Sequence, residues 1–135
     1  MQVKDLMSDK PEVVQSDADL HDALTKMNQH GYRHLLVVEG RRLVGIITDR
    51  DVRLAVNSPV IAPDTHLTRL EALEGVKVFD CMTPDPKCVP SDMPLHEAAD
   101  LLALNKFGAM PVVDDGKLVG LISTVDFLKH YAAQR

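Results

Sequence analysis

Two short stretches of the chain place a hydroxyl and a carboxylate three residues apart, directly after a run of apolar residues. In the first stretch, LVGIITDRD, Thr48 precedes Asp51, and in the second, LVGLISTVD, Ser123 precedes Asp126. Where a strand ends and a helix begins, free backbone N–H groups and the positive end of the helix dipole favour an anion. A carboxylate there can accept hydrogen bonds from the vicinal hydroxyls of a ribose. These side chains therefore suit the binding of a phosphorylated nucleoside.

The same spacing also matches a helix capping box, in which the hydroxyl and the carboxylate satisfy amides of the helix and bind nothing else. Gly45 and Gly120 stand three residues before each hydroxyl and let another backbone come close, because no side chain is in the way. Asp is a weaker partner in such a box than Glu or Gln. Capping and ligand binding can also occur together, so both interpretations stay open at this point.

The two stretches belong to a longer internal repeat. Shifting the sequence by 75 positions aligns Val3–Val56 with Val78–Tyr131 without a gap. The identical pairs include Asp5/Asp80, Met7/Met82, Ser16/Ser91, His21/His96, Gly45/Gly120 and Asp51/Asp126. Units of this size bury little surface alone, so the two copies should share a core. We therefore divide the chain into a first repeat at residues 1–56, a linker at residues 57–77 and a second repeat at residues 78–135.

The linker differs in character from both repeats. Its first part, Asn57–Pro63, contains two prolines and is typical of a loop. Thr65 is then expected to cap a short helix that ends at Gly75, because leucines recur at helical spacing between the two residues. We expect this helix to connect the repeats.

Within each repeat, the pattern of apolar residues predicts a strand, a helix, a β-hairpin and a final helix. Val13–Gln15 and Cys88–Pro90 are short extended pieces, the second at a sheet edge because its last residue, a proline, has no N–H. Apolar residues at helical spacing follow, beginning at Leu20 and Leu95. Asp17 and Asp19 are expected to supply the capping and early-turn charge of the first of these helices, and Gly31 is expected to end it.

The hairpins are expected to turn at Glu39–Arg41 and at Asp114–Lys117, where the sequence DDG is a strong turn signal. Their strands are nearly continuous apolar runs, so both faces of each strand should be covered. The last helix of each repeat begins at Thr48 or Ser123. The predicted fold class is therefore α/β (α+β), with two tandem β-α-β-β-α repeats.

Composition argues against several classes of protein. The chain has 135 residues, 45% of them hydrophobic, which suits a globular protein. Its formal net charge of −5 argues against nucleic-acid binding, which calls for a basic face. No apolar run is long enough to cross a membrane, and the first residues lack the apolar stretch of a signal peptide, so we expect a cytoplasmic protein.

Patterns of catalysis and metal binding are also missing from the sequence. Cys81 and Cys88 are expected to be free thiols, because their spacing does not match a zinc site. His21 and His96 occupy equivalent positions in the repeats, which favours a shared place on a helix over a role as metal ligands. We find no Ser-His-Asp, Cys-His or paired-carboxylate arrangement, so we predict no catalytic residue, no metal and no required cofactor.

With its repeated G-h-h-[S/T]-x-x-D motif and the similar starts MSDKPEVV and MTPDPKCV, the chain resembles a tandem pair of cystathionine-β-synthase (CBS) domains. The resemblance covers nearly the whole chain. It implies a stand-alone regulatory module whose repeats pack as a pseudo-twofold pair with two clefts between them. Such clefts commonly bind AMP, ADP, ATP or S-adenosylmethionine, and such modules often form homodimers. In the family, the Ser or Thr of the motif contacts phosphate or ribose, and the Asp binds the ribose hydroxyls.

The resemblance further implies basic residues before the hairpin in members that bind phosphorylated nucleotides. The first repeat has Arg33 and His34 at that position, and Arg50 lies in its motif. The second repeat has Gly108 and Val125 at the places of the two arginines. We therefore expect a nucleotide to bind more tightly in the first repeat. The candidate binding residues are Arg33, His34, Gly45, Thr48, Arg50, Asp51, Gly120, Ser123 and Asp126.

Our leading hypothesis is a regulatory module that binds an adenosine-containing ligand and signals through a protein partner or a change of oligomer. A ligand-free scaffold whose repeats only dimerise is the alternative, and an enzyme is a further one. A nucleotide-induced rise in melting temperature discriminates between them, because a ligand at 100 times its Kd adds about 2.7 kcal/mol of stability.

Overall fold

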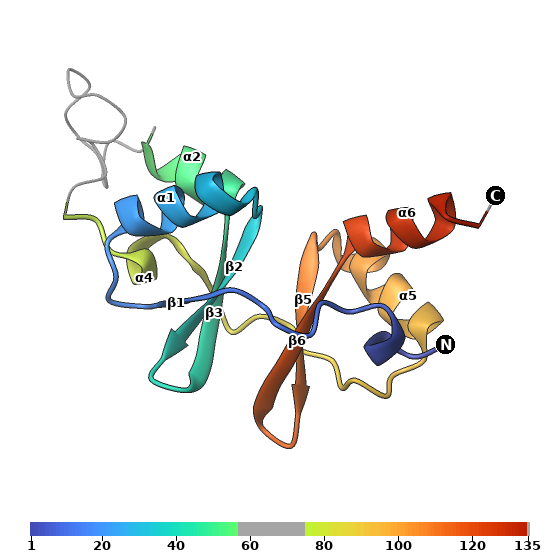
Figure 1. The fold of residues 1–135 in the computed structure, drawn as a ribbon. Coiled ribbons are helices and arrows are strands. Elements are labelled where there is room, and N and C mark those ends of the chain that lie inside the picture. The colour runs from blue at the N-terminus through green and yellow to red at the C-terminus, as the bar shows by residue number, and fades with distance from the viewer. Residues whose placement is uncertain (57–74, 135) are drawn as a thin grey trace. The chain divides into compact units, whose positions relative to one another are not determined.

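In the computed structural model, which describes residues 1–56 and 75–134, the chain forms two compact units (Figure 1). The N-terminal unit comprises Glu12–Asp85, and the C-terminal unit comprises Met1–Pro11 together with Pro86–Arg135. The first eleven residues therefore pack with the second repeat, although they precede the first repeat in sequence.

The connecting helix that we expected between Thr65 and Gly75 falls, except for Gly75 itself, outside the described residues. Gly75 has a positive φ of 79°. Because only glycine adopts this conformation readily, the residue suits the end of a helix or a turn.

The N-terminal unit is a four-stranded sheet with helices packed against it. Its elements are β1 (Val13–Gln15), α1 (Leu20–His30), β2 (His34–Glu39), β3 (Arg42–Thr48), α2 (Asp49–Val56), α4 (Val78–Cys81) and β4 (Thr83–Pro84). The strands lie in the order β1-β2-β3-β4, with β1 parallel to β2 and the other two pairs antiparallel. Strand β2 buries the four consecutive residues Leu35–Val38, which confirms that this apolar run is covered on both faces.

The C-terminal unit repeats this arrangement, except that single bridges take the place of the two outer strand pairings. Its elements are a 3₁₀ turn η1 (Val3–Asp5), α5 (Leu95–Asn105), β5 (Ala109–Asp114), β6 (Lys117–Ser123) and α6 (Thr124–Ala132). The piece predicted at Cys88–Pro90 is a single parallel bridge from Val89 to Val112, since the proline that follows donates no ladder hydrogen bond. On the other side, Ser8 forms an antiparallel bridge with Leu121. The two bridges correspond to the pairings of β1 and β4.

The two ends of α1 show how local residues set its limits. At the end, Gly31 has a φ of 69° and its N–H bonds to the carbonyl of Met27; Lys106 takes the matching left-handed position after α5, with a φ of 56°. At the start, Asp19 occupies the N-cap position as expected, but its side chain makes no cap hydrogen bond. The Asp19 carboxylate instead accepts a hydrogen bond from Lys77 Nζ at 2.6 Å. This ion pair ties the start of α1 to the segment before α4.

Each unit has its own core of aliphatic and methionine side chains. The core of the N-terminal unit contains Val14, Leu20, Ala23, Met27, Leu35, Val37, Ile47, Val52, Ala55, Val76 and Val78. The core of the C-terminal unit contains Val3, Val89, Ala98, Leu102, Met110, Val112 and Ile122. Fully burying one such side chain stabilises the fold by about 1.5–3 kcal/mol.

The first residues of each repeat pack in the unit that contains the rest of the other repeat. The two cases make equivalent contacts. The N–H of Val3 donates to the carbonyl of Met93, and the N–H of Val78 donates to the carbonyl of Ala18, both at 2.9 Å. Both valines are fully buried. Each unit is thus completed by the first residues of the other repeat.

Candidate functional site

The first candidate site lies where β3 ends and α2 begins. The N–H of Thr48 donates to Asp51 Oδ2 at 3.0 Å, and the N–H of Asp51 donates to Thr48 Oγ1 at 3.1 Å. The N–H of Asp49 donates to the carbonyl of Arg33 at 3.1 Å. These bonds fix the hydroxyl and the carboxylate side by side at the start of the helix. We call the group Arg33, His34, Thr48, Arg50 and Asp51 the Thr48 half-site.

The second candidate site has the same geometry between β6 and α6. The N–H of Ser123 donates to Asp126 Oδ2 at 2.8 Å, and the N–H of Asp126 donates to Ser123 Oγ at 3.3 Å. The N–H of Thr124 donates to the carbonyl of Gly108 at 3.0 Å, as the matching residues do in the first site. We call Ser123 and Asp126 the Ser123 half-site.

Both motifs are therefore capping boxes in the structure, the alternative that the sequence left open. Two backbone amides at the start of each helix already donate to acceptors within the protein. They are those of Asp49 and Asp51 in α2 and of Thr124 and Asp126 in α6. Fewer free N–H groups are therefore left at each helix start to bind a phosphate. In the described part of the chain, each box carboxylate uses only Oδ2, and Oδ1 makes no hydrogen bond. Capping thus leaves one oxygen of each carboxylate for a ligand.

The structure brings the predicted basic residues of the first repeat to the same end of the hairpin. His34 lies opposite Thr48 across the β2–β3 pair, and the carbonyl of Arg33 bonds to the first turn of α2. The side chains of Arg33 and Arg50 are exposed, whereas that of His34 is half-buried. In the second repeat, Ala109 lies opposite Ser123 in the same register, without a basic neighbour at these positions. The two half-sites share their box and differ in positive charge.

Gly45 and Gly120 have a packing role in their own units. A Cβ on Gly45 would lie 2.5 Å from Met82 Sδ and 2.9 Å from the carbonyl oxygen of Thr83. A Cβ on Gly120 would lie 2.6 Å from Met7 Sδ, with a carbonyl oxygen at 2.7 Å. The backbone that approaches each glycine is therefore the start of the other repeat. This contact accounts for both glycines without a ligand.

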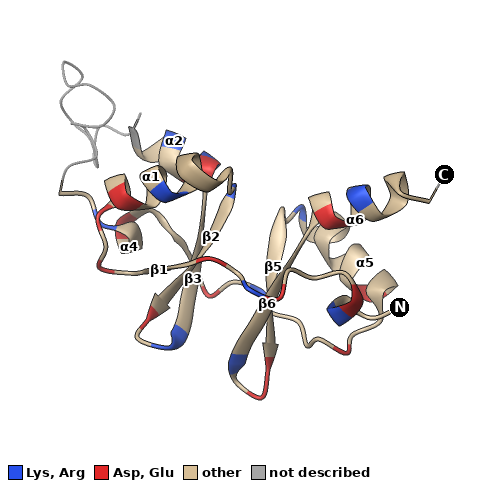
Figure 2. Ribbon diagram, in the orientation of Figure 1, with Lys and Arg blue, Asp and Glu red and all other residues tan. Residues whose placement is uncertain are grey.

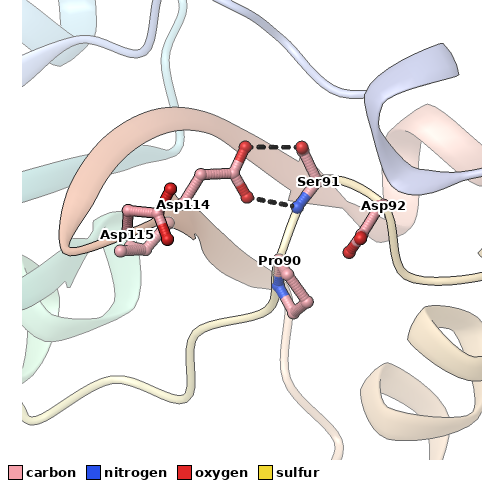
Figure 3. Close-up of a pocket in the computed structure, with 6 residues that line it drawn as sticks. Pro90, Ser91, Asp92, Asp114 and Asp115 are labelled. Carbon is pink, nitrogen blue, oxygen red and sulfur yellow. Dashed lines mark hydrogen bonds between the residues drawn. The ribbon is translucent and has the colours of Figure 1, made fainter.

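A shallow pocket of about 320 Å³ in the C-terminal unit is a feature that the sequence did not point to (Figure 3). It is lined by Pro90, Ser91, Asp92, Val113, Asp114 and Asp115. Asp114 accepts hydrogen bonds from both the N–H and the hydroxyl of Ser91, at 2.9 and 2.5 Å. The hydroxyl, and then the N–H, lower the pKa of the Asp114 carboxyl. The identity of Ser16 and Ser91 was the one signal in the sequence for this contact.

The surface charge of the two hairpins also differs (Figure 2). The hairpin end at Glu39–Arg42 carries one acidic and two basic residues, and the equivalent end at Asp114–Lys117 carries two acidic residues and one basic residue. The pocket is lined by the carboxylates of Asp92, Asp114 and Asp115 and by no basic residue, so it is not suited to a phosphorylated ligand. The Thr48 half-site remains the better place for an anion.

The thiols and the acidic groups offer no reactive or metal-binding centre in the described residues. Burial, and then the nearby carboxylates of Asp80 and Asp51, raise the pKa of Cys81 to about 11, and burial raises the pKa of Cys88. Both thiols are free and are protonated at neutral pH. Within residues 1–56 and 75–134 no cluster of His, Cys, Asp or Glu could hold a metal ion. None of the helices described has the length and apolar character needed to span a membrane.

Comparison with known proteins gives consistent results for the whole chain. A protein-family model, that of the CBS domain, matches residues 3–58 and again residues 78–133. A CBS domain-containing protein of Dictyostelium discoideum is 38% identical over 128 residues, which cover 93% of this chain and 88% of that protein.

Solved structures show the same fold. The structure of CBSX2 in complex with AMP has a TM-score of 0.80 at 30% identity, and the match covers 99% of this chain and 98% of that one. The CBS domain pair of protein MJ0100 from a complex with 5-methylthioadenosine and S-adenosyl-L-methionine has a TM-score of 0.79 at 25% identity, covering 97% and 99%. Two of the solved structures that this chain resembles over nearly its whole length are thus complexes with adenosine derivatives.

Proposed function

Because this chain belongs to the CBS domain family and carries two copies of the domain, we propose that it is a regulatory module that binds an adenosine-containing ligand and is not an enzyme. The ligand classes that fit are AMP, ADP, ATP and S-adenosylmethionine. The structurally similar proteins form complexes with AMP in one case and with S-adenosylmethionine in the other, which supports an adenosine group as the common feature.

The observation that carries this proposal is the doubled hydroxyl–carboxylate box. In each half-site the hydrogen bonds within the box hold the carboxylate in place, and Oδ1 is left to accept from a ribose hydroxyl. The hydroxyl of Thr48 or Ser123 accepts from an amide and can still donate its own hydrogen to the ligand. We assign ribose recognition to Asp51 and Asp126 on this basis.

We further propose that a phosphorylated ligand prefers the Thr48 half-site. Exposed Arg33 and Arg50 can form charge-assisted, bidentate hydrogen bonds with phosphate, and His34 lies beside them in the register. The Ser123 half-site offers its hydroxyl and carboxylate alone. The preference should decline as salt rises, because exposed charges are screened.

The output of such a module has to pass through another molecule. We propose that the chain works as a homodimer whose regulated protein partner responds to the bound ligand. The second candidate, a ligand-free scaffold that only dimerises, is favoured by one observation: the boxes already satisfy their own helices without a ligand. The experiment below separates the two.

The test is nucleotide binding by wild-type protein and by Asp51→Asn and Asp126→Asn, measured by calorimetry and thermal shift. Asn keeps the size of Asp and still accepts the box hydrogen bond, so the unliganded melting temperature should barely change. Loss of a hydrogen bond to a charged group should weaken binding at the altered half-site by about 1.5–3 kcal/mol. In the same titrations, Arg33→Ala should weaken ATP binding and leave adenosine binding unchanged.

Asp49→Asn is the matched control, because it removes the same charge from the same turn of α2 without touching the box. It should bind nucleotide nearly as wild type does. Absence of any nucleotide effect on wild-type melting would favour the scaffold. Unchanged affinity in Asp51→Asn, together with a large loss of unliganded stability, would show that the carboxylate only caps.

A further inference from the structure

Met7 and Met82 are the two methionines that occupy equivalent positions in the repeats. The chain has six methionines, and the other four align with residues other than methionine: Met1 with Val76, Met27 with Leu102, Met93 with Ala18 and Met110 with Leu35. The proposed function gives Met7 and Met82 no role, since both lie outside the two half-sites. The structure nevertheless gives the two the same surroundings.

In the N-terminal unit, the sulfur of Met82 lies against Gly45. A Cβ on this glycine would be 2.5 Å from Met82 Sδ and 2.9 Å from the carbonyl oxygen of Thr83, so the sulfur and this oxygen are close neighbours. The contact lies where β4 pairs with β3, with Gly45 opposite Pro84. Met82 therefore packs at the point where the start of the second repeat joins the sheet of the N-terminal unit.

In the C-terminal unit, the sulfur of Met7 lies against Gly120 in the same way. The carbonyl oxygen of Ser8 is again a close neighbour, 2.7 Å from the position of a Cβ on this glycine. Ser8 bridges to Leu121, and each N–H donates to the carbonyl of the other residue, at 2.9 and 3.0 Å. Each methionine thus lies beside the backbone contact by which the start of one repeat completes a unit.

Both side chains are half-buried and pack against the core of their unit, so they are accessible in part. The oxygen of a methionine sulfoxide is a polar acceptor. The carbonyl oxygen beside each sulfur is also an acceptor, so the two oxygens would repel each other where a thioether packs well. A sulfoxide without a hydrogen bond in this place is unfavourable, and moving it into water removes the methionine from its glycine.

We propose that Met7 and Met82 are a paired modification site for a peroxide, and that their oxidation releases the segments that complete the two units. In this step a lone pair of the thioether sulfur bonds to one peroxide oxygen while the O–O bond breaks. The proton of the transferred oxygen passes to the leaving oxygen, which departs as water when the peroxide is hydrogen peroxide. The sulfur is oxidised to the sulfoxide and the peroxide is reduced.

The other sulfur groups of the described residues are less suited to this reaction. Met27 and Met110 are 4% and 0% exposed, so a peroxide reaches them only when a core opens. Burial raises the pKa of Cys81 and of Cys88, so little of the reactive thiolate is present at neutral pH. Met1 is 64% exposed, so an oxygen added to its sulfur stays in water and disturbs little packing.

The first experiment treats the ligand-free wild-type chain with hydrogen peroxide and follows each methionine by peptide mass spectrometry. Met7 and Met82 should gain oxygen at least about tenfold faster than Met27 and Met110, because local opening requires less free energy than opening of a core. The urea midpoint of the oxidised chain should fall.

Hydrogen exchange then locates the change within the chain. Oxidation of Met7 should speed exchange of the amides of Ser8 and Leu121, which bond across their bridge. Oxidation of Met82 should speed exchange at Asp85, whose N–H donates to a carbonyl of β3 at 3.2 Å. In Met7→Leu, peroxide should change exchange at Asp85 and leave the other two amides as they were.

The chain with both Met7→Leu and Met82→Leu is the matched control. Leu nearly conserves the volume of Met and has no sulfur to oxidise, so this variant should fold, and peroxide should leave its urea midpoint unchanged. It keeps both cysteines and the half-buried Met93, so damage to those groups would still appear in it. Methionine sulfoxide reductases for both epimers give a check without substitution, because repair of oxidised wild type should restore its midpoint.

Three results would each overturn the inference. They are reaction of Met7 and Met82 no faster than that of Met27 and Met110, an oxidised wild-type chain that keeps its midpoint, and a double Leu variant that loses as much on peroxide treatment as wild type does. Every measurement is made without nucleotide, so failure of the ligand-binding proposal leaves this inference standing, and the reverse is also true.

Discussion

At the scale of single residues, the Ser91–Asp114 pair shows how one hydroxyl and one amide hold a turn. Ser91 donates its hydroxyl and its N–H to the two oxygens of Asp114. In the N-terminal unit, the Ser16 hydroxyl reaches Glu39 Oε1 only at 3.5 Å, because the longer side chain places its oxygens differently. The same serine therefore makes a strong contact in one unit and a weak one in the other.

Ser91→Ala should lower stability in a pH-dependent way. The pKa of Asp114 is lowered in the folded chain, so its contribution is present above the ordinary value of 3.8 and is lost as pH falls through the folded pKa. Urea unfolding at a series of pH values should show the largest gap between wild type and variant near neutral pH, shrinking in acid. Ser16→Ala, the control, should show a smaller pH-dependent gap. A gap that stays constant through the acid range would contradict the role of the charge.

At the scale of elements, the two equivalent helices α1 and α5 end in the same left-handed conformation with different residues. Gly31 adopts it without strain, whereas Lys106 adopts it with a φ of 56°. A side chain in this region is disfavoured by contact between Cβ and the backbone. The end of α5, with Lys106, is therefore less favourable for folding than the equivalent end of α1, with Gly31.

Lys106→Gly should stabilise the protein by about 0.5–1 kcal/mol, because relief of the left-handed strain exceeds the extra freedom of glycine in the unfolded chain. The reverse change, Gly31→Lys, should destabilise it by about 1 kcal/mol. Urea midpoints of both variants measure this. Equal, near-zero shifts in the two variants would mean that the conformation is not strained for Lys.

At the scale of the whole molecule, the compact units and the sequence repeats have different boundaries. Val78 and Met82 belong to the second repeat but pack in the N-terminal unit, and Val3 and Met7 belong to the first repeat but pack in the C-terminal unit. A chain that ends with the first repeat therefore lacks core residues of the N-terminal unit. It also keeps residues 1–11, whose packing partners lie in the missing second repeat.

A fragment of residues 12–85 should fold, and a fragment of residues 1–77 should not, although their lengths are similar. The first contains every described element of the N-terminal unit; the second lacks the buried Val78 and the Met82 that packs on Gly45. Losing a buried aliphatic residue and a sheet strand costs several kcal/mol, which is much of the stability of a small domain. A cooperative urea transition monitored by circular dichroism is the measurement. Cooperative folding of 1–77 would contradict the assignment of residues 78–85.

The sequence by itself determined those features that depend on neighbouring residues. The strand at β1, the helix ending at Gly31, and the hairpins follow from spacing and turn residues, since these act over one or two turns of chain. The capping boxes at Thr48 and Ser123 are equally local, with partners three residues apart. The repeat itself was visible because identical residues recur at one fixed distance.

Only the tertiary structure decided which segments complete each unit. Nothing in local spacing joins Ser8 to Leu121, or Met7 to Gly120, because these contacts link residues more than one repeat apart. The bond of Asp19 to Lys77 replaced an expected cap for the same reason: a distant cation competes better for the carboxylate than the nearby amides do. Such contacts form when the folded chain brings remote groups within a few ångströms, and sequence periodicity does not contain that distance.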